Sequence, residues 1–153
     1  MKNRMEVFVG ADYKGFEKKV ELVQFLIEKS YDVIEQGSKD GLNNLDFNDA
    51  AIEVAKAVRE NPGSRGILIC DSAHGMTMQA NRFKGVRAAN CDCPESAKLA
   101  REHDDANVLC MSAGLMSLDE MKNVATTFLA TDFEPLERRV RRINRLDERE
   151  DYD

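Results

Sequence analysis

Short apolar runs alternate with amphipathic stretches along nearly the whole chain, and this alternation constrains the fold more than any other feature. The runs have the length and the Val, Ile and Phe content of buried strands, and they lie at residues 5–12, 31–37, 66–70, 85–91 and 106–113. Helical patterns follow at residues 14–30, 48–61, from about 74, at 94–103 and 117–131, and from about 135. We therefore predict an α/β protein with one domain over residues 1–153: a doubly wound five-stranded parallel sheet, a Rossmann-like α/β/α sandwich, with an extra C-terminal helix.

The helix boundaries carry their own signals. Asn48 is placed to cap the second helix, and Ser117 with Glu120 has the spacing of a capping box. In the last helix, Leu136, Val140 and Ile143 form the predicted apolar stripe.

Composition narrows the class of protein. A chain of 153 residues can bury a substantial core. No apolar run approaches the roughly 20 residues that span a bilayer, and the first residues lack the apolar segment of a signal peptide. The net charge of −6 disfavours nonspecific binding to nucleic acid. We expect a cytoplasmic protein with no membrane or nucleic-acid partner.

In doubly wound sheets, ligands bind beyond the carboxyl ends of the strands, near a topological switch point. The residues predicted to stand there are Asp12, Tyr13 and the segments 70–75, 91–93 and 112–114. No glycine-rich dinucleotide motif, phosphate-binding loop or nucleophile elbow is present, which argues against nucleotide binding and serine hydrolysis.

Cys70, in the stretch "GILICDSAHGM", has two interpretations. It can be a small buried hydrophobe that ends a strand. It can also be a reactive thiol, since the backbone N–H groups of a following helix favour a thiolate and a developing oxyanion, although the adjacent Asp71 opposes a second negative charge. The residues alone leave both open.

Other candidates also have structural alternatives. His103 and His74 stand at predicted helix ends, where His103 could simply interact with the helix dipole. Asp12 could accept sugar hydroxyls or cap the following helix. The basic residues between Arg138 and Arg145 could form a solvated face. A metal site among the cysteines and histidines is conceivable, but "CDC" lacks the usual ligand spacing, and we expect none.

Five motifs resemble those of a known family and stand in the same order: "GADYKGF", "GILICDSAHGM", "NRFKGVRAA", "LAREHDDANVL" and "FLATDFE". The family is type B ribose-5-phosphate isomerase, with the related galactose-6-phosphate isomerase subunits, and the similarity runs over residues 5–143. The resemblance implies the fold predicted above, a homodimer or homotetramer with active sites between subunits, and a sugar phosphate as substrate. It also implies aldose–ketose isomerisation through a cis-enediolate, without a metal or other cofactor.

The resemblance assigns roles to residues of this chain. Cys70 is the catalytic base, Ser72 assists it, and His103 opens the sugar ring. The loop from Ser72 to Gly75 holds the enediolate oxygen through its backbone amides. The remaining substrate-binding positions implied are Asp12, Tyr13, Asp71, Ala73, His74, Gly75, Asp104, Arg138 and Arg141.

The chain departs from the family pattern around the substrate. A histidine of the family is Tyr13 here, two glycines are Asp71 and Ala73, a further loop glycine is His74, and an asparagine is Asp104. At two positions where the family has arginines that bind the phosphate, this chain has Gly114 and Glu137. Of these phosphate-binding arginines, only Arg141 is present at the family's position.

These departures leave several functions open: a galactose-6-phosphate isomerase subunit, an isomerase of another sugar, a non-catalytic sugar-binding relative or a thiol-based redox protein. We expect Arg141, with Arg138 or Arg145, to reach a phosphate in a neighbouring subunit. In that changed register, ribose 5-phosphate should be a poor substrate.

Overall fold

The structure, a computed structural model, describes residues 4–37, 41 and 46–148. Most of the predicted loop at 38–47 lies outside the described residues. The strands are β1 (Glu6–Ala11), β2 (Asp32–Gly37), β3 (Arg65–Cys70), β4 (Ala88–Asn90) and β5 (Val108–Ser112). The helices are α1 (Phe16–Glu28), α2 (Phe47–Glu60), α3 (His74–Ala80), α4 (Pro94–Asp104), α5 (Leu118–Ala130) and α6 (Glu137–Asp147). None of these helices is long and apolar enough to cross a membrane.

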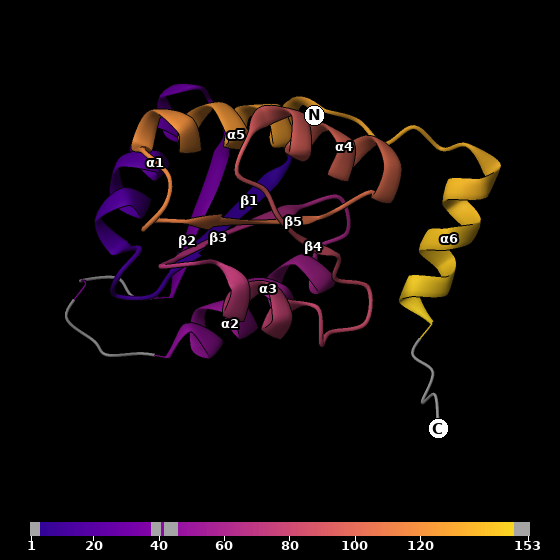
Figure 1. The fold of residues 1–153 in the computed structure, drawn as a ribbon, viewed down its shortest axis with the longest axis horizontal. Coiled ribbons are helices and arrows are strands. Elements are labelled where there is room, and N and C mark those ends of the chain that lie inside the picture. The colour runs from indigo at the N-terminus through magenta and orange to yellow at the C-terminus, as the bar shows by residue number, and fades with distance from the viewer. Residues whose placement is uncertain (1–3, 38–40, 42–45, 149–153) are drawn as a thin grey trace.

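The strands form one parallel sheet in the order β2-β1-β3-β5-β4, with α1, α4 and α5 over one face and α2 and α3 over the other (Figure 1). The predicted α/β/α sandwich and its extra C-terminal helix are therefore confirmed. The chain leaves β1 toward one face and β3 toward the other, so the neighbouring carboxyl ends of β1 and β3 form the topological switch point.

The third strand shows how the two core layers are built. Successive side chains of a strand point to opposite faces, so Ile67 and Ile69 pack beneath α1 and α5, while Leu68 packs against α2 and α3. All three are fully buried, as expected for a central strand covered on both faces. Cys70 continues the Leu68 side and ends the strand on the face of α2 and α3.

One of the two predicted helix caps is present. The Ser117 hydroxyl accepts a hydrogen bond from the Glu120 N–H at 3.1 Å, and the Glu120 carboxylate accepts one from the Ser117 N–H at 2.9 Å, which confirms the capping box. The prediction for Asn48 is wrong. Helix α2 begins at Phe47 with Asp46 at the N-cap position, and the Asn48 amide instead donates to the Gln79 side chain at 2.8 Å, joining α2 to α3.

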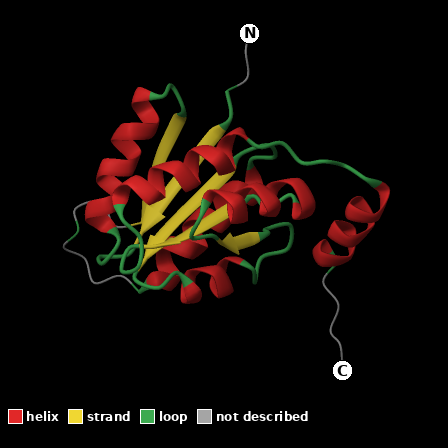
Figure 2. Cartoon of the chain, turned by 45° about the horizontal axis from the view of Figure 1, so that its top comes forward, coloured by secondary structure: helices red, strands yellow, loops and turns green. Residues whose placement is uncertain are grey.

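Helix α6 stands away from the sheet, beyond α4 (Figures 1 and 2). Of its predicted apolar stripe, Ile143 is buried, whereas Leu136 and Val140 remain exposed. The Arg87 guanidinium donates to both Asp147 oxygens, at 3.1 and 3.0 Å, and so ties the end of α6 to the segment before β4. This places α6 on the side of the sheet where the strands begin.

Candidate active site

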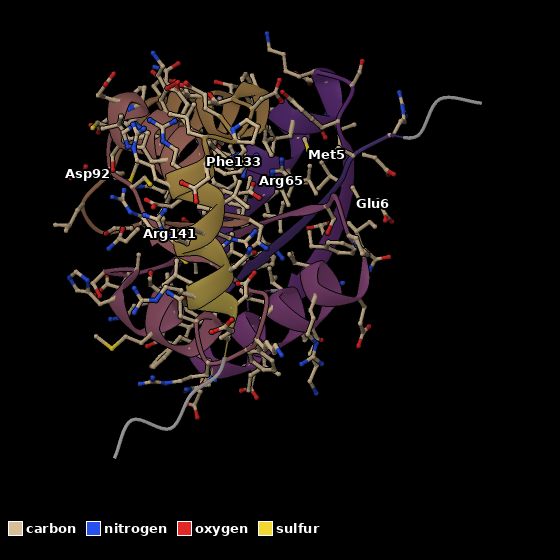
Figure 3. The ribbon with its side chains drawn as sticks, turned by 90° about the vertical axis from the view of Figure 1, so that its right-hand side faces the viewer. Met5, Glu6, Arg65, Asp92, Phe133 and Arg141 are labelled. Carbon is tan, nitrogen blue, oxygen red and sulfur yellow. The ribbon has the colours of Figure 1, made fainter. Side chains whose placement is uncertain are left out.

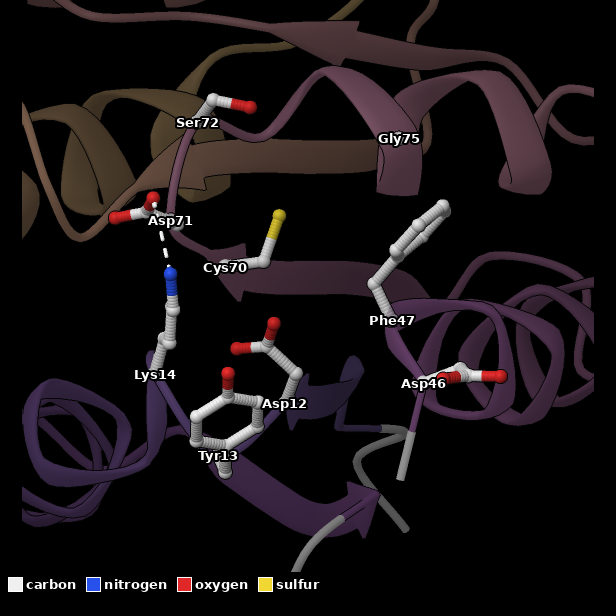
Figure 4. A pocket seen from close by; sticks show the side chains of 9 residues that line it. All are labelled: Asp12, Tyr13, Lys14, Asp46, Phe47, Cys70, Asp71, Ser72 and Gly75. Atoms are coloured by element: carbon white, nitrogen blue, oxygen red, sulfur yellow. Dashed lines mark ion pairs between the residues drawn. The ribbon is translucent and has the colours of Figure 1, made fainter. Parts of the chain in front are cut away.

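A cavity of about 500 Å³ opens at the switch point, between the loops that follow β1 and β3 (Figure 4). The start of α2 closes it on the third side. Its lining residues are Asp12, Tyr13, Lys14, Asp46, Phe47, Cys70, Asp71, Ser72 and Gly75. Of the residues predicted to stand at the carboxyl ends of the strands, Asp12, Tyr13 and four residues of segment 70–75 line this cavity, whereas segments 91–93 and 112–114 do not.

The Cys70 thiol is nearly buried, with 5% of the residue exposed, and α3 begins four residues after it. Burial raises the pKa of the Cys70 thiol, and the charge of Asp12 acts in the same direction. Backbone N–H groups of Ala73, Met76 and Ser72 lower the pKa and oppose part of this effect. The carboxylate that raises this pKa is thus Asp12, whereas the sequence pointed to Asp71.

Asp12 lies beside Cys70 (Figure 4), and it is not the N-cap of α1, a position that Gly15 occupies. One carboxylate oxygen accepts a hydrogen bond from the Gly15 N–H at 2.9 Å, which fixes the turn that leads into α1. The same side chain lines the cavity. Burial raises the pKa of Asp12, and the charge of Asp71 adds to this, while the N–H groups of Gly15 and Lys14 oppose it.

The loop between β3 and α3 is held in an unusual conformation. Ala73 has a left-handed backbone with φ of 72°, which costs an alanine about 1 kcal/mol. The Thr77 hydroxyl donates to the Ala73 carbonyl at 2.7 Å. At Gly75, an added Cβ would lie 2.6 Å from the Phe47 ring, so the missing side chain of Gly75 leaves room for that ring beside the cavity.

Asp71 adds a negative charge to the lining of the cavity. An added Cβ at Gly114 would lie 2.5 Å from one Asp71 oxygen, so the Asp71 carboxylate fills space into which a larger residue 114 would project. The other oxygen lies 3.6 Å from the Lys14 ammonium, with both side chains more than half exposed. Lys14 is the one cation among the described lining residues, which also include three acids, Asp12, Asp46 and Asp71.

Two predicted residues adjoin this cavity without lining it. Ala73 is completely buried beneath the loop. His74 lines a neighbouring cavity of about 280 Å³, which shares Ser72 with the first. There, a His74 ring nitrogen lies 3.4 Å from the Asn90 amide nitrogen. Ser72 therefore stands between the two cavities.

The other predicted residues lie at the opposite edge of the sheet. His103 and Asp104 end α4, just before β5 begins at Val108, whereas Cys70 pairs with Ser112 at the far end of that strand. Four steps along β5, from Val108 to Ser112, span roughly 13 Å. Arg138 and Arg141 lie on α6, on the same side as His103. Within one chain these residues are therefore far from Cys70, and the expectation that they act in a neighbouring subunit stays a prediction.

Three lining residues were missed from the sequence: Lys14, Asp46 and Phe47. Lys14 directly follows Asp12 and Tyr13, so its place in the loop was available as a signal. Asp46 and Phe47 come from the start of α2, and only the packing of α2 against Gly75 brings them to the cavity. Within the described part of the chain, no three side chains of His, Cys, Asp or Glu gather closely enough to hold a metal ion.

Comparison with known proteins agrees with this geometry. Residues 7–146 match the model of the ribose/galactose isomerase family. The chain belongs to this family. It is 35% identical over 129 residues to ribose-5-phosphate isomerase B of Escherichia coli, covering 84% of this chain and 86% of that protein. It is equally identical, again over 84% of its length, to a 4-deoxy-4-sulfo-D-erythrose isomerase of a Clostridium species, of which it covers 81%.

A solved structure is also closely similar. Ribose-5-phosphate isomerase B of Mycoplasma genitalium, crystallised with bound ribulose 5-phosphate, superposes with a TM-score of 0.89 at 35% identity, over 94% of each chain.

Proposed function

We propose that this chain is an aldose–ketose isomerase of a sugar phosphate, with the Cys70 thiolate as the base. The observation that carries the proposal is a nearly buried thiol at the switch-point cavity, in a chain that matches the isomerase family over most of its length. A structural cysteine would need no cavity beside it. The relatives, whose names specify isomerases of sugar phosphates and of a sulfo-sugar, support the same reaction class.

The reaction needs a base, and the surroundings of Cys70 suit one. The thiolate removes the proton from the carbon next to the carbonyl of the open-chain sugar, and the electron pair forms a cis-enediolate. The same proton, or one from water, then returns to the neighbouring carbon, while the hydroxyl proton passes to the former carbonyl oxygen. The sugar is therefore isomerised with no net oxidation, and no metal is required. Because burial raises the pKa of Cys70, the thiolate is scarce at neutral pH but is a strong base when it forms.

The loop after β3 supplies the groups that stabilise the intermediate. Backbone N–H groups from Ser72 to Gly75 are placed to hold the enediolate oxygen, and the Ser72 hydroxyl assists proton transfer. Asp12 and Tyr13 bind sugar hydroxyls from the other wall of the cavity.

We infer a homodimer, or a tetramer built from such dimers, as the active form. One chain separates Cys70 from His103 by the length of β5, and a two-fold axis can bring the partner subunit's His103 and Asp104 over the Cys70 cavity. The arginines on α6 of that partner subunit would bind the phosphate of the substrate. Arg141 is already paired with Glu137 at 2.9 Å, whereas Arg138 has no ion pair within the described ranges, so Arg138 is the stronger candidate.

The substrate is a short sugar with an anionic end. Relatives of equal identity are named for a phosphate and for a sulfonate, so the family accepts both anions. Asp71 occupies space beside Gly114 and adds negative charge there, which supports a substrate other than ribose 5-phosphate. The free state of Cys70, Cys91, Cys93 and Cys110 fits a reducing compartment, and we propose the cytoplasm.

A substrate panel tests this function. Purified protein is assayed with four-, five- and six-carbon aldose phosphates and with a sulfonate analogue, each with and without a chelator. We expect turnover of one class, unaffected by the chelator and lost in Cys70→Ala. Tight binding without turnover of any member would favour a sugar-binding relative, and activity restored only by added metal would refute the metal-free mechanism.

A further inference from the structure

A second cavity, of about 460 Å³, lies at the edge of the sheet where the strands begin. It is formed by the end of α2 and the segments that precede β3, β4 and β5. Its lining residues are Val58, Arg59, Pro62, Gly63, Ser64, Arg65, Gly85, Arg87, Asp105 and Asn107. Because Arg65 begins β3 and Cys70 ends it, about 16 Å of strand separates this cavity from the thiol.

Some polar groups of this cavity are already satisfied by protein partners. Arg87 donates to the Asp105 carbonyl at 2.9 Å, to an Asp105 side-chain oxygen at 3.3 Å and to Asp147. The Asn107 amide donates to the Gly85 carbonyl at 2.9 Å. These groups hold the wall of the cavity together and are not available to a ligand.

Arg65 and Arg59 differ from Arg87 in having no carboxylate partner among the described residues. One terminal nitrogen of Arg65 donates to the carbonyls of Gly63 and Ser64, at 3.2 and 3.1 Å, while its Nε is buried with no acceptor in the described part of the chain. Arg59 lies over the Phe83 ring, 5.4 Å from its centre. Two positive charges therefore line the cavity without a neutralising ion pair.

The neighbourhood of Arg65 makes its missing counter-ion costly. Burial lowers the pKa of Arg65. The charges of Arg101 and Arg87 act in the same direction, while those of Asp105 and Asp132 oppose it. Ser64 is only 4% exposed, and its hydroxyl has no hydrogen-bond partner among the described residues. A buried polar group without a partner is destabilising, so a ligand that supplies acceptors would be bound favourably here.

We propose that this cavity binds a small phosphate-bearing anion through the Arg65 and Arg59 guanidinium groups, with a shift of the Ser64 hydroxyl completing its hydrogen bonds. A guanidinium fork matches the oxygens of a phosphate in bidentate geometry. The alternative partner for these two arginines is a carboxylate from a second copy of the chain. The concave shape favours a small ligand, since the volume is close to that of the Cys70 cavity.

The test is a titration of the intact, ¹⁵N-labelled protein with inorganic phosphate, followed by NMR. We expect two separate responses: one at the amides of Ser64, Gly85 and Asn107, and one at the loop beside Cys70. Arg65→Gln should weaken the first response by at least about tenfold and leave the second unchanged. Arg82→Gln is the matched control, because it removes an exposed arginine that does not line the cavity, and it should change neither.

Several outcomes would overturn the proposal. The first set of amides could remain unmoved while phosphate saturates the Cys70 cavity, or its response could survive Arg65→Gln. A smaller assembly of Arg65→Gln in light scattering would identify a second copy of the chain as the source of negative charge. If Arg65→Gln does not fold, Arg59→Gln is used in its place. An unchanged phosphate affinity of Arg59→Gln, measured at the amides of Ser64, Gly85 and Asn107, would also contradict the proposal.

Discussion

Two variants that are inactive alone should restore activity when their subunits are mixed. Cys70→Ala removes the proposed base, and His103→Ala removes the proposed ring-opening histidine. Within one chain, β5 alone separates the two ends by roughly 13 Å, whereas groups that act on one sugar must each approach it to about 3 Å. If the active site is shared, the two functional residues of a working site come from different subunits.

The expected recovery follows from the symmetry of a dimer. A heterodimer of the two variants has one site with both residues intact and one site with neither. Random exchange makes half of the dimers mixed, so the sample should regain about a quarter of wild-type activity. The variants are unfolded in denaturant, mixed, refolded and assayed, with each variant refolded alone as the control. No recovery in a sample whose mixed dimers are confirmed by native mass spectrometry would refute the shared site.

Three further predictions concern the cavity itself. Because the base must be a thiolate and burial raises the pKa of Cys70, kcat/KM should rise with pH through neutrality into the alkaline range. Asp12→Asn should shift this rise to lower pH, because the charge of Asp12 raises the pKa of Cys70. A pH profile that does not shift would assign the rise to a group other than Cys70. Asp71→Asn should lower KM for the anionic substrate by about fivefold, because it removes a like charge, while Lys14→Gln should raise KM. Equal KM values for the wild type and Asp71→Asn in steady-state assays would show that Asp71 does not face the anion. Ala73→Gly should raise the free energy of unfolding in urea by about 0.5 kcal/mol, because relief of the left-handed alanine exceeds the added entropy of the unfolded chain; a loss of stability would contradict the strain assigned to Ala73.

Much of the fold could be predicted from the sequence because it depends on local patterns. The apolar runs and amphipathic stretches specify strands and helices, and their alternation specifies a parallel sheet. The capping box could be predicted because it is also a local pattern, with Ser117 and Glu120 three residues apart. Asn48 failed as a cap because helix α2 starts earlier and the Asn48 amide finds a partner on α3, which is a tertiary contact.

In the candidate site, too, some residues could be predicted from local sequence patterns and others depend on tertiary packing. Asp12, Cys70 and Ser72 could be placed together because parallel strands bring their carboxyl ends to one edge. Asp46 and Phe47 could not, since they reach the cavity only through the packing of α2. Residues at the ends of helices lie at the opposite edge of the sheet from residues at the ends of strands. This explains why His103 is far from Cys70 within one chain.

The ion pair between Lys14 and Asp71 had no sequence signal of its own. It depends on Gly114, whose missing side chain leaves room for the Asp71 carboxylate. The resemblance drew attention to residue 114 as an absent arginine, and the structure adds that an acid fills the adjoining space. The charge of the cavity is therefore a property of three loops together.

The most direct test of the central claim follows proton transfer at carbon in heavy water. Wild-type protein and Cys70→Ala are incubated in D₂O with the best substrate of the panel, and isomerisation and deuterium uptake into the sugar are measured by NMR and mass spectrometry, with folding checked by circular dichroism. We predict that the wild type isomerises the sugar with uptake of deuterium at the carbon that exchanges its proton, and that Cys70→Ala loses both activities by about 10²–10⁴-fold while remaining folded. A folded Cys70→Ala that isomerises the same sugar at the wild-type rate would contradict the account.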